Sequence, residues 1–251
     1  MTPLGPRYGS PLIQARYSCQ AWWHDARHPQ EPIVVTHCGK LGDFIATLPI
    51  ASWLFRTRRR KIHFALARSF APFAQIESLL LLQDMTHAVT LLDFPVVDWE
   101  KGGEPYIHDP NRFGIATSEY YNFGFRRTPR RFVPEYVAEE HGVGYDSEFR
   151  LKLGDFPGTA EVLVSDEHML VEVPHAKPLD LTQDILANAR RMAGAREAHV
   201  SQSGLFHILD WAGITPTRVY IYPHSVNIHL FSRRLSEFEI VNVQRDVRPR
   251  K

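Results

Sequence analysis

Residues 33–55 constrain the fold of this chain more than any other segment. Residues 33–35 are β-branched and apolar, which predicts a short buried strand. Gly39 and Gly42 then predict a tight loop, and apolar residues at roughly helical spacing predict a helix from Phe44. We therefore expect a strand, a glycine loop and a helix whose N-terminal N–H groups point at any ligand above the loop.

Two further features of this segment shape the prediction. Asp43 stands where the loop meets the helix, a position where aspartate often serves only as a cap. Pro49 lies inside the helical run and is expected to kink the helix or end its first turn. The loop is not a P-loop, because Leu41 rather than serine or threonine follows Lys40.

The same residues resemble the N-terminal signature of family 9 glycosyltransferases, the ADP-heptose:lipopolysaccharide heptosyltransferases. In that family a Gly-x-Leu-Gly-Asp loop precedes a helix with a proline one turn in, as residues 39–49 do here. The family's loop aspartate is regarded as the general base, so the resemblance implies this role for Asp43. It also assigns to the acceptor side the other loop residues, Gly39, Lys40, Leu41 and Gly42.

Composition indicates a soluble globular protein. The chain has 251 residues, of which 44% are hydrophobic and 23% charged. The formal net charge of +1 gives no global field that would attract nucleic acid or an anionic membrane. Two arginine-rich runs, 56–61 and 126–131, fit either solvated surface or a docking surface for a phosphate-rich acceptor or a membrane face.

Cysteine and histidine usage predicts no structural metal and no cofactor. Cys19 and Cys38 form no metal-binding motif, and the 13 histidines are scattered along the chain. Two cysteines also fit a reducing compartment. The N-terminus does not resemble a signal peptide, and no apolar run approaches the ~20 residues that span a bilayer. We therefore expect a cytoplasmic protein without a transmembrane segment.

The first half of the chain alternates strands and helices. Residues 61–67 and 88–92 are predicted strands, and residues 70–82 and 134–143 are predicted helices, the second capped by Gly142. Short connections between such elements imply a parallel sheet of Rossmann type. Between them, residues 93–131 are rich in proline and glycine and are expected to be irregular, either as acceptor contacts or as a plain surface loop. The first domain is predicted to span residues 1–148.

The second half, residues 149–251, is predicted to be a smaller α/β domain. It contains three strand candidates, a helix candidate over residues 180–192, and a strand–turn–helix pattern over residues 198–213. The strand candidates are 162–164, 169–173 and 219–222.

The strand–turn–helix pattern resembles the family's C-terminal signature, an Asp-Thr/Ser-Gly-x-x-His loop that holds the donor diphosphate. Ser203, Gly204 and His207 match it, whereas Gln202 replaces the aspartate. His207 fits a ligand role and a packing role equally. The resemblance implies an α/β fold of two Rossmann-like lobes facing a cleft, the GT-B arrangement, with a reduced second lobe. The donor-binding residues that it implies are Ser201, Gln202, Ser203, Gly204, His207 and His224.

The implied function is metal-independent transfer of a hexose or heptose from a nucleotide-diphosphate sugar to a glycan or another hydroxyl acceptor. A second hypothesis is a sugar-nucleotide or glycan-binding protein without catalysis, which the small second lobe and Gln202 favour. A third is a transferase acting on modified nucleic acid, against which the near-neutral charge argues. A Rossmann-like hydrolase is disfavoured because the sequence has no Gly-x-Ser-x-Gly elbow.

Overall fold

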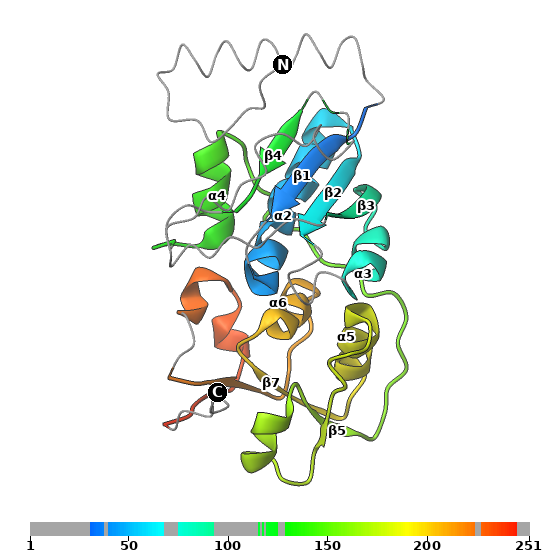
Figure 1. Ribbon diagram of the computed structural model, residues 1–251. Helices are drawn as coiled ribbons and strands as arrows, with labels where there is room; N and C mark the ends of the chain where they lie inside the picture. The colour runs from blue at the N-terminus through cyan, green and yellow to red at the C-terminus, as the bar shows by residue number, and fades with distance from the viewer. Residues whose placement is uncertain are drawn as a thin grey trace. The chain divides into compact units, whose positions relative to one another are not determined.

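The chain forms two compact units, Met1–Phe149 and Arg150–Lys251, each built on its own parallel sheet (Figure 1). The computed structural model describes the following residues: 31–37, 40–67, 75–92, 115, 117, 119–124, 129–223 and 227–244.

The first unit contains a four-stranded parallel sheet in the order β3-β2-β1-β4. The strands are β1 (Ile33–His37), β2 (Ile62–Ala67), β3 (Thr86–Leu92) and β4 (Tyr120–Asn122). The first three confirm the predicted strands. β4 contradicts the expectation that residues 93–131 are wholly irregular, because it pairs with β1 from Val34 to Thr36. Three residues are too few to show a period in the sequence, so only pairing with a distant strand reveals it.

Three helices accompany this sheet: α2 (Leu41–Arg58), α3 (Glu77–Leu81) and α4 (Val133–His141). α2 begins three residues earlier than predicted, and Pro49 does not end its first turn, because the helix continues to Arg58. Phe44 packs edge-on against Phe64 of β2, which fixes the buried face of α2. α3 is shorter than predicted, and residues 70–74 lie outside the described part. α4 ends as predicted at Gly142, whose φ of 63° favours glycine.

One arginine of the basic run at residues 56–61, Arg60, is buried in the first unit. The side chains of Arg60 and Glu119 are each 2% exposed and form an ion pair of 2.7 Å. The Tyr121 hydroxyl donates to the other oxygen of Glu119 at 2.8 Å. Arg56 pairs with Asp146 at 2.9 Å. Arg60 therefore belongs to the interior of the unit, whereas Arg56, Arg59 and Lys61 are exposed, which fits both interpretations of the run.

The second unit contains a five-stranded parallel sheet in the order β6-β5-β7-β8-β9. Its strands are β5 (Val162–Val164), β6 (Lys177–Pro178), β7 (Glu197–Ser201), β8 (Arg218–Ile221) and β9 (Ile240–Asn242). The strand predicted at residues 169–173 is wrong, because a 3-10 helix, η4 (Glu167–Val171), occupies most of it. Asp166 caps this turn, and Val171 is 57% exposed, which a buried strand would not allow.

The helices of the second unit are α5 (Ile185–Ala193), α6 (Gly204–Trp211) and two further 3-10 turns, η5 (Ile228–Leu230) and η6 (Leu235–Glu237). α5 begins later than predicted because Asp184 accepts hydrogen bonds from the N–H groups of Leu186 and Ala187 and so sets the N-terminus. Leu181, which the predicted helix included, is therefore outside the helix and 58% exposed. α5 and α6 pack together over one face of the sheet.

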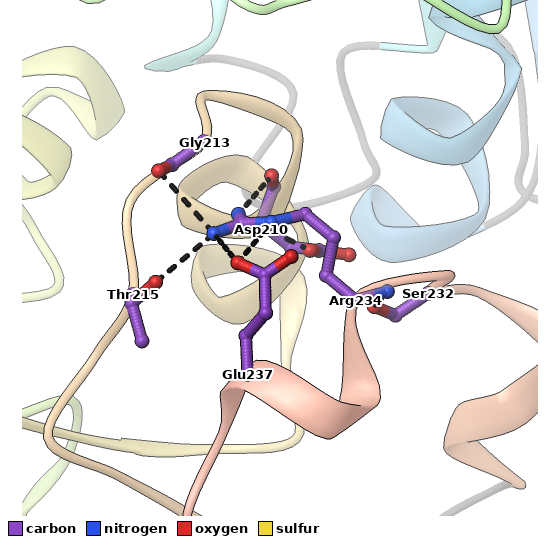
Figure 2. A network of polar contacts seen from close by, with 6 residues as sticks. All are labelled: Asp210, Gly213, Thr215, Ser232, Arg234 and Glu237. Carbon is purple, nitrogen blue, oxygen red and sulfur yellow. Dashed lines mark hydrogen bonds and ion pairs between the residues drawn. The ribbon is translucent and has the colours of Figure 1, made fainter.

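Arg234 closes the C-terminal end of α6 (Figure 2). Its guanidinium donates to the carbonyls of Asp210 at 2.9 Å and Gly213 at 3.3 Å, and to the hydroxyl of Thr215 at 3.0 Å. Glu237 accepts from the same guanidinium at 2.6 and 2.9 Å. Burial raises the pKa of Asp210 to about 6, although Ser232 and Arg234 lower it. The Arg234 guanidinium therefore donates hydrogen bonds to carbonyls at the C-terminal end of α6 and places a positive charge near the buried carboxylate of Asp210.

We expect Arg234→Met to lower the free energy of unfolding by roughly 1–3 kcal/mol, because it removes the donor to the Asp210 carbonyl and leaves the buried Asp210 carboxylate without its nearby cation. Arg196→Met is the matched control, since Arg196 pairs with Glu197 on the surface and its removal should change stability by no more than about 0.5 kcal/mol. Urea unfolding followed by tryptophan fluorescence measures both. Equal stabilities of the two variants would contradict the proposed role of Arg234.

Candidate functional site

Both motifs singled out in the sequence lie at a switch point of a parallel sheet. In the first unit, β2 and β3 extend the sheet on one side of β1, and β4 pairs on the other side. In the second unit, β6 pairs with β5 on one side, and β7, followed by β8 and β9, extends the sheet on the other side. Ligands of open α/β sheets bind outside the carboxyl ends of the strands at such points. Residues 40–43 follow β1, and residues 201–204 follow β7.

At the first junction Asp43 lies in the first turn of α2. Its carboxylate accepts a hydrogen bond of 3.2 Å from the N–H of Lys40, the N-cap residue. Burial raises the pKa of Asp43 to about 6, while the N–H and the charge of Lys40 lower it. A carboxyl group that exchanges its proton near neutral pH suits general acid–base chemistry.

Buried residues flank Asp43 in the chain. Burial lowers the pKa of His37, the last residue of β1, to about 3, so its ring is neutral at physiological pH. The His37 ring packs against Phe44 at 5.7 Å between centroids. Leu41 is buried and Lys40 is exposed, so of the two only Lys40 presents its side chain to solvent. Gly42 lies in the first turn of α2, and Gly39 lies outside the described residues.

At the second junction Ser203 is the N-cap of α6. Its backbone is extended, and among the described residues its side chain makes no capping hydrogen bond, so the first N–H groups of the helix lack the cap that a serine here often provides. Gly204 is the first helical residue and adds no side chain to this end. A helix N-terminus with a serine hydroxyl beside it is suited to an anion such as a phosphate.

Gln202 precedes this N-cap residue, and a hydrogen bond holds its backbone in place. Its N–H donates to the carbonyl of Tyr220 in β8 at 3.1 Å. Within the described residues, neither polar atom of its side-chain amide has a hydrogen-bond partner, and both atoms are buried. Buried amides in native proteins normally have partners.

Ser201, the last residue of β7, forms hydrogen bonds with the two residues that follow β5. Its hydroxyl donates to Asp166 at 2.9 Å, and its N–H donates to the hydroxyl of Ser165 at 3.0 Å. Neither Ser165 nor Asp166 resembles a motif. The available signal was their position directly after the predicted strand 162–164, at the end where α/β sheets bind ligands.

His207 is buried in the second unit. It is 4% exposed, and its ring contacts Phe206 at 5.1 Å and Phe231 at 4.9 Å between centroids. Burial lowers its pKa to about 3, so it is neutral at physiological pH. These contacts favour the packing role over the ligand role. His224 lies outside the described residues.

Within the part of the chain that the structure describes, no group of three or more histidine, cysteine, aspartate or glutamate side chains could hold a metal ion. Among the same residues, no helix combines the length and the apolar character needed to cross a membrane.

Solved structures show which known fold the chain shares. No protein-family model matches the sequence, and no curated protein matches it. A glycosyltransferase of family 9 from Veillonella parvula superimposes with a TM-score of 0.53 and 12% identity, over 85% of this chain and 86% of the other. E. coli heptosyltransferase WaaC with ADP gives a TM-score of 0.51 and 10% identity, over 83% and 92%.

A third structure is the dodecameric iron-containing heptosyltransferase TibC in complex with ADP-D-beta-D-heptose. It gives a TM-score of 0.51 and 12% identity over 87% of this chain and 63% of that one. The chain therefore has the α/β fold of family 9 glycosyltransferases, as the resemblance of its two motifs implied.

Proposed function

We propose that this protein transfers a sugar from a nucleotide-diphosphate sugar to an acceptor hydroxyl. The observation that carries the proposal is the pairing of each family-like motif with a switch point of its own sheet. One switch point presents a carboxyl group, Asp43, whose pKa is about 6. The other presents the N-terminus of α6 with the hydroxyl of its N-cap residue, Ser203. In this proposal Asp43 is the base for the acceptor hydroxyl, and the N-terminus of α6 binds a phosphate of the donor.

The proposed mechanism needs two events. Asp43 takes the proton of the acceptor hydroxyl as its oxygen bonds to the anomeric carbon of the donor sugar. The bond from that carbon to the diphosphate oxygen breaks, and the electron pair leaves with the diphosphate. The N–H groups at the start of α6 and the hydroxyl of Ser203 stabilise the negative charge that develops there. The mechanism assigns no step to a metal ion.

ADP-sugars are the first donors to test, because WaaC is described with ADP and TibC with ADP-D-beta-D-heptose. We propose a heptose or hexose as the transferred group. The acceptor is a glycan or another hydroxyl compound.

A thermal-shift panel tests donor binding. We expect one of ADP, UDP, GDP, CDP or dTDP, or its sugar ester, to raise the melting temperature, since a ligand at 100 times its Kd adds about 2.7 kcal/mol of stability. Ser203→Ala should reduce the shift, and Arg196→Met, on the surface of the same unit, should not. If no nucleotide at millimolar concentration shifts the wild type, the proposal fails. If the donor binds but no sugar is transferred to any acceptor, the binding-protein hypothesis replaces it.

A further inference from the structure

Asp166 stands at the switch point of the second unit and connects the two strands that border it. It follows β5, and its carboxylate accepts the hydroxyl proton of Ser201, the last residue of β7, at 2.9 Å. Its other oxygen accepts a hydrogen bond from the N–H of His168 at 3.1 Å, and the Ser165 hydroxyl donates at 3.3 Å to the same oxygen as Ser201. These contacts hold the carboxylate in one orientation at the place where α/β sheets bind ligands.

The carboxylate of Asp166 still has capacity for a ligand. An ionised carboxylate offers about four acceptor positions, and the described contacts come from three groups, one of them long. Asp166 is only partly buried. Because a carboxylate only accepts hydrogen bonds, it binds hydroxyl groups and repels phosphate oxygens. The N-terminus of α6, which follows Ser201 by three residues, has the opposite preference.

Gln202 provides a second, independent observation at the same loop. Both polar atoms of its side-chain amide are buried and have no partner among the described residues. Leaving such groups unpaired costs roughly 1–3 kcal/mol, which a ligand can recover by supplying a partner. Hydroxyl groups both donate and accept, so they can satisfy the amide nitrogen and the amide oxygen.

We propose that Asp166 binds a pair of neighbouring hydroxyl groups of the nucleotide sugar, beside the diphosphate at α6. The inference rests on the proposed function and adds a substrate-binding residue to it. A nucleotide sugar carries two such pairs, one on the ribose and one on the transferred sugar. Both have the chemistry that a fixed carboxylate recognises, and the experiment below separates them.

The test is calorimetric titration of wild type and Asp166→Asn with three ligand sets. These are ADP, UDP, GDP and CDP, their 2′-deoxy forms, and their glucose esters. Asparagine keeps the size of the side chain and an oxygen that can cap η4, but it removes the charge. Since hydrogen bonds to charged groups are the stronger ones, the affinity lost should be roughly 10- to 100-fold. The melting temperature without ligand reports folding separately.

The pattern of loss identifies the hydroxyl pair. If the ribose is bound, Asp166→Asn weakens the ribonucleotides, and the 2′-deoxy forms bind wild type and variant equally weakly. If the transferred sugar is bound, the variant loses only the extra affinity of the glucose esters.

Glu161→Gln is the matched control, because Glu161 precedes β5 at its opposite end and pairs with Arg191 and Lys177. It should leave every affinity unchanged, and an equal loss in this control would overturn the inference. Unchanged affinities in Asp166→Asn, with the wild type binding normally, would overturn it while leaving the proposed function intact. A wild type that binds none of the ligands would overturn both.

Discussion

Replacing Asp43 with asparagine is expected to lower the rate of sugar transfer by about 10²- to 10⁴-fold, because the variant cannot take the acceptor proton. The affinity for the donor should stay within a few-fold of wild type, since the proposed donor cradle is in the other unit. Single-turnover transfer at saturating donor measures the rate, and nucleotide titration measures the affinity. A variant that transfers sugar at the wild-type rate would exclude Asp43 as the base.

Folding should survive this substitution. Burial raises the pKa of Asp43, so ionising this carboxyl at neutral pH costs stability, and a neutral amide removes that cost. The amide oxygen can still accept the N–H of Lys40. We therefore expect a melting temperature at pH 7 equal to or above that of wild type. A clear fall in the melting temperature would instead assign Asp43 a mainly structural role.

The pH dependence follows from the same pKa. A base acts when it is ionised, so transfer should be fully active above a pH of about 6 and fall about tenfold for each unit below it. Asp43→Asn should remove this acidic limb from the residual activity. A limb of the same position in wild type and variant would belong to another group.

The second large effect is expected at the buried ion pair between Arg60 and Glu119. Glu119→Gln should lower the free energy of unfolding by roughly 3–5 kcal/mol, because it leaves a buried guanidinium without its counter-charge. The loss should be greatest around the start of β4, since the N–H of Val34 in β1 donates to the carbonyl of Glu119. Urea unfolding measures the free energy of unfolding, and hydrogen exchange at Tyr120–Asn122 shows whether the loss of stability is greatest at β4.

Two further variants make this prediction specific. Glu139→Gln removes an exposed partner of Arg131 and should change stability by no more than about 0.5 kcal/mol. Replacing both members of the buried pair, with Arg60→Met and Glu119→Leu, should recover much of the loss, because no unpaired charge is then buried. A loss below about 1 kcal/mol in Glu119→Gln would mean that Arg60 reaches water and is not dependent on the pair.

The elements that the sequence predicted well are those whose signal is local. Examples are the apolar run of β1, the glycine that ends α4 and the Ser203 N-cap before α6. Each of these signals fixes the conformation of only a few neighbouring residues in the chain. The elements predicted wrongly were decided by distant contacts or by side-chain caps. Residues 169–173 are apolar enough for a strand, but the carboxylate of Asp166 caps a 3-10 turn there instead.

The two loop–helix junctions are predictable from sequence, because the residues that build each junction are contiguous in the chain. The residues that stand beside each junction come from distant segments and depend on how the strands pair. Asp166 meets Ser201 across 35 positions of sequence, since β5 and β7 are neighbours in the sheet. The raised pKa of Asp43 likewise comes mainly from burial. Burial depends on how the rest of the chain packs around α2, so no residue pattern within α2 predicts it.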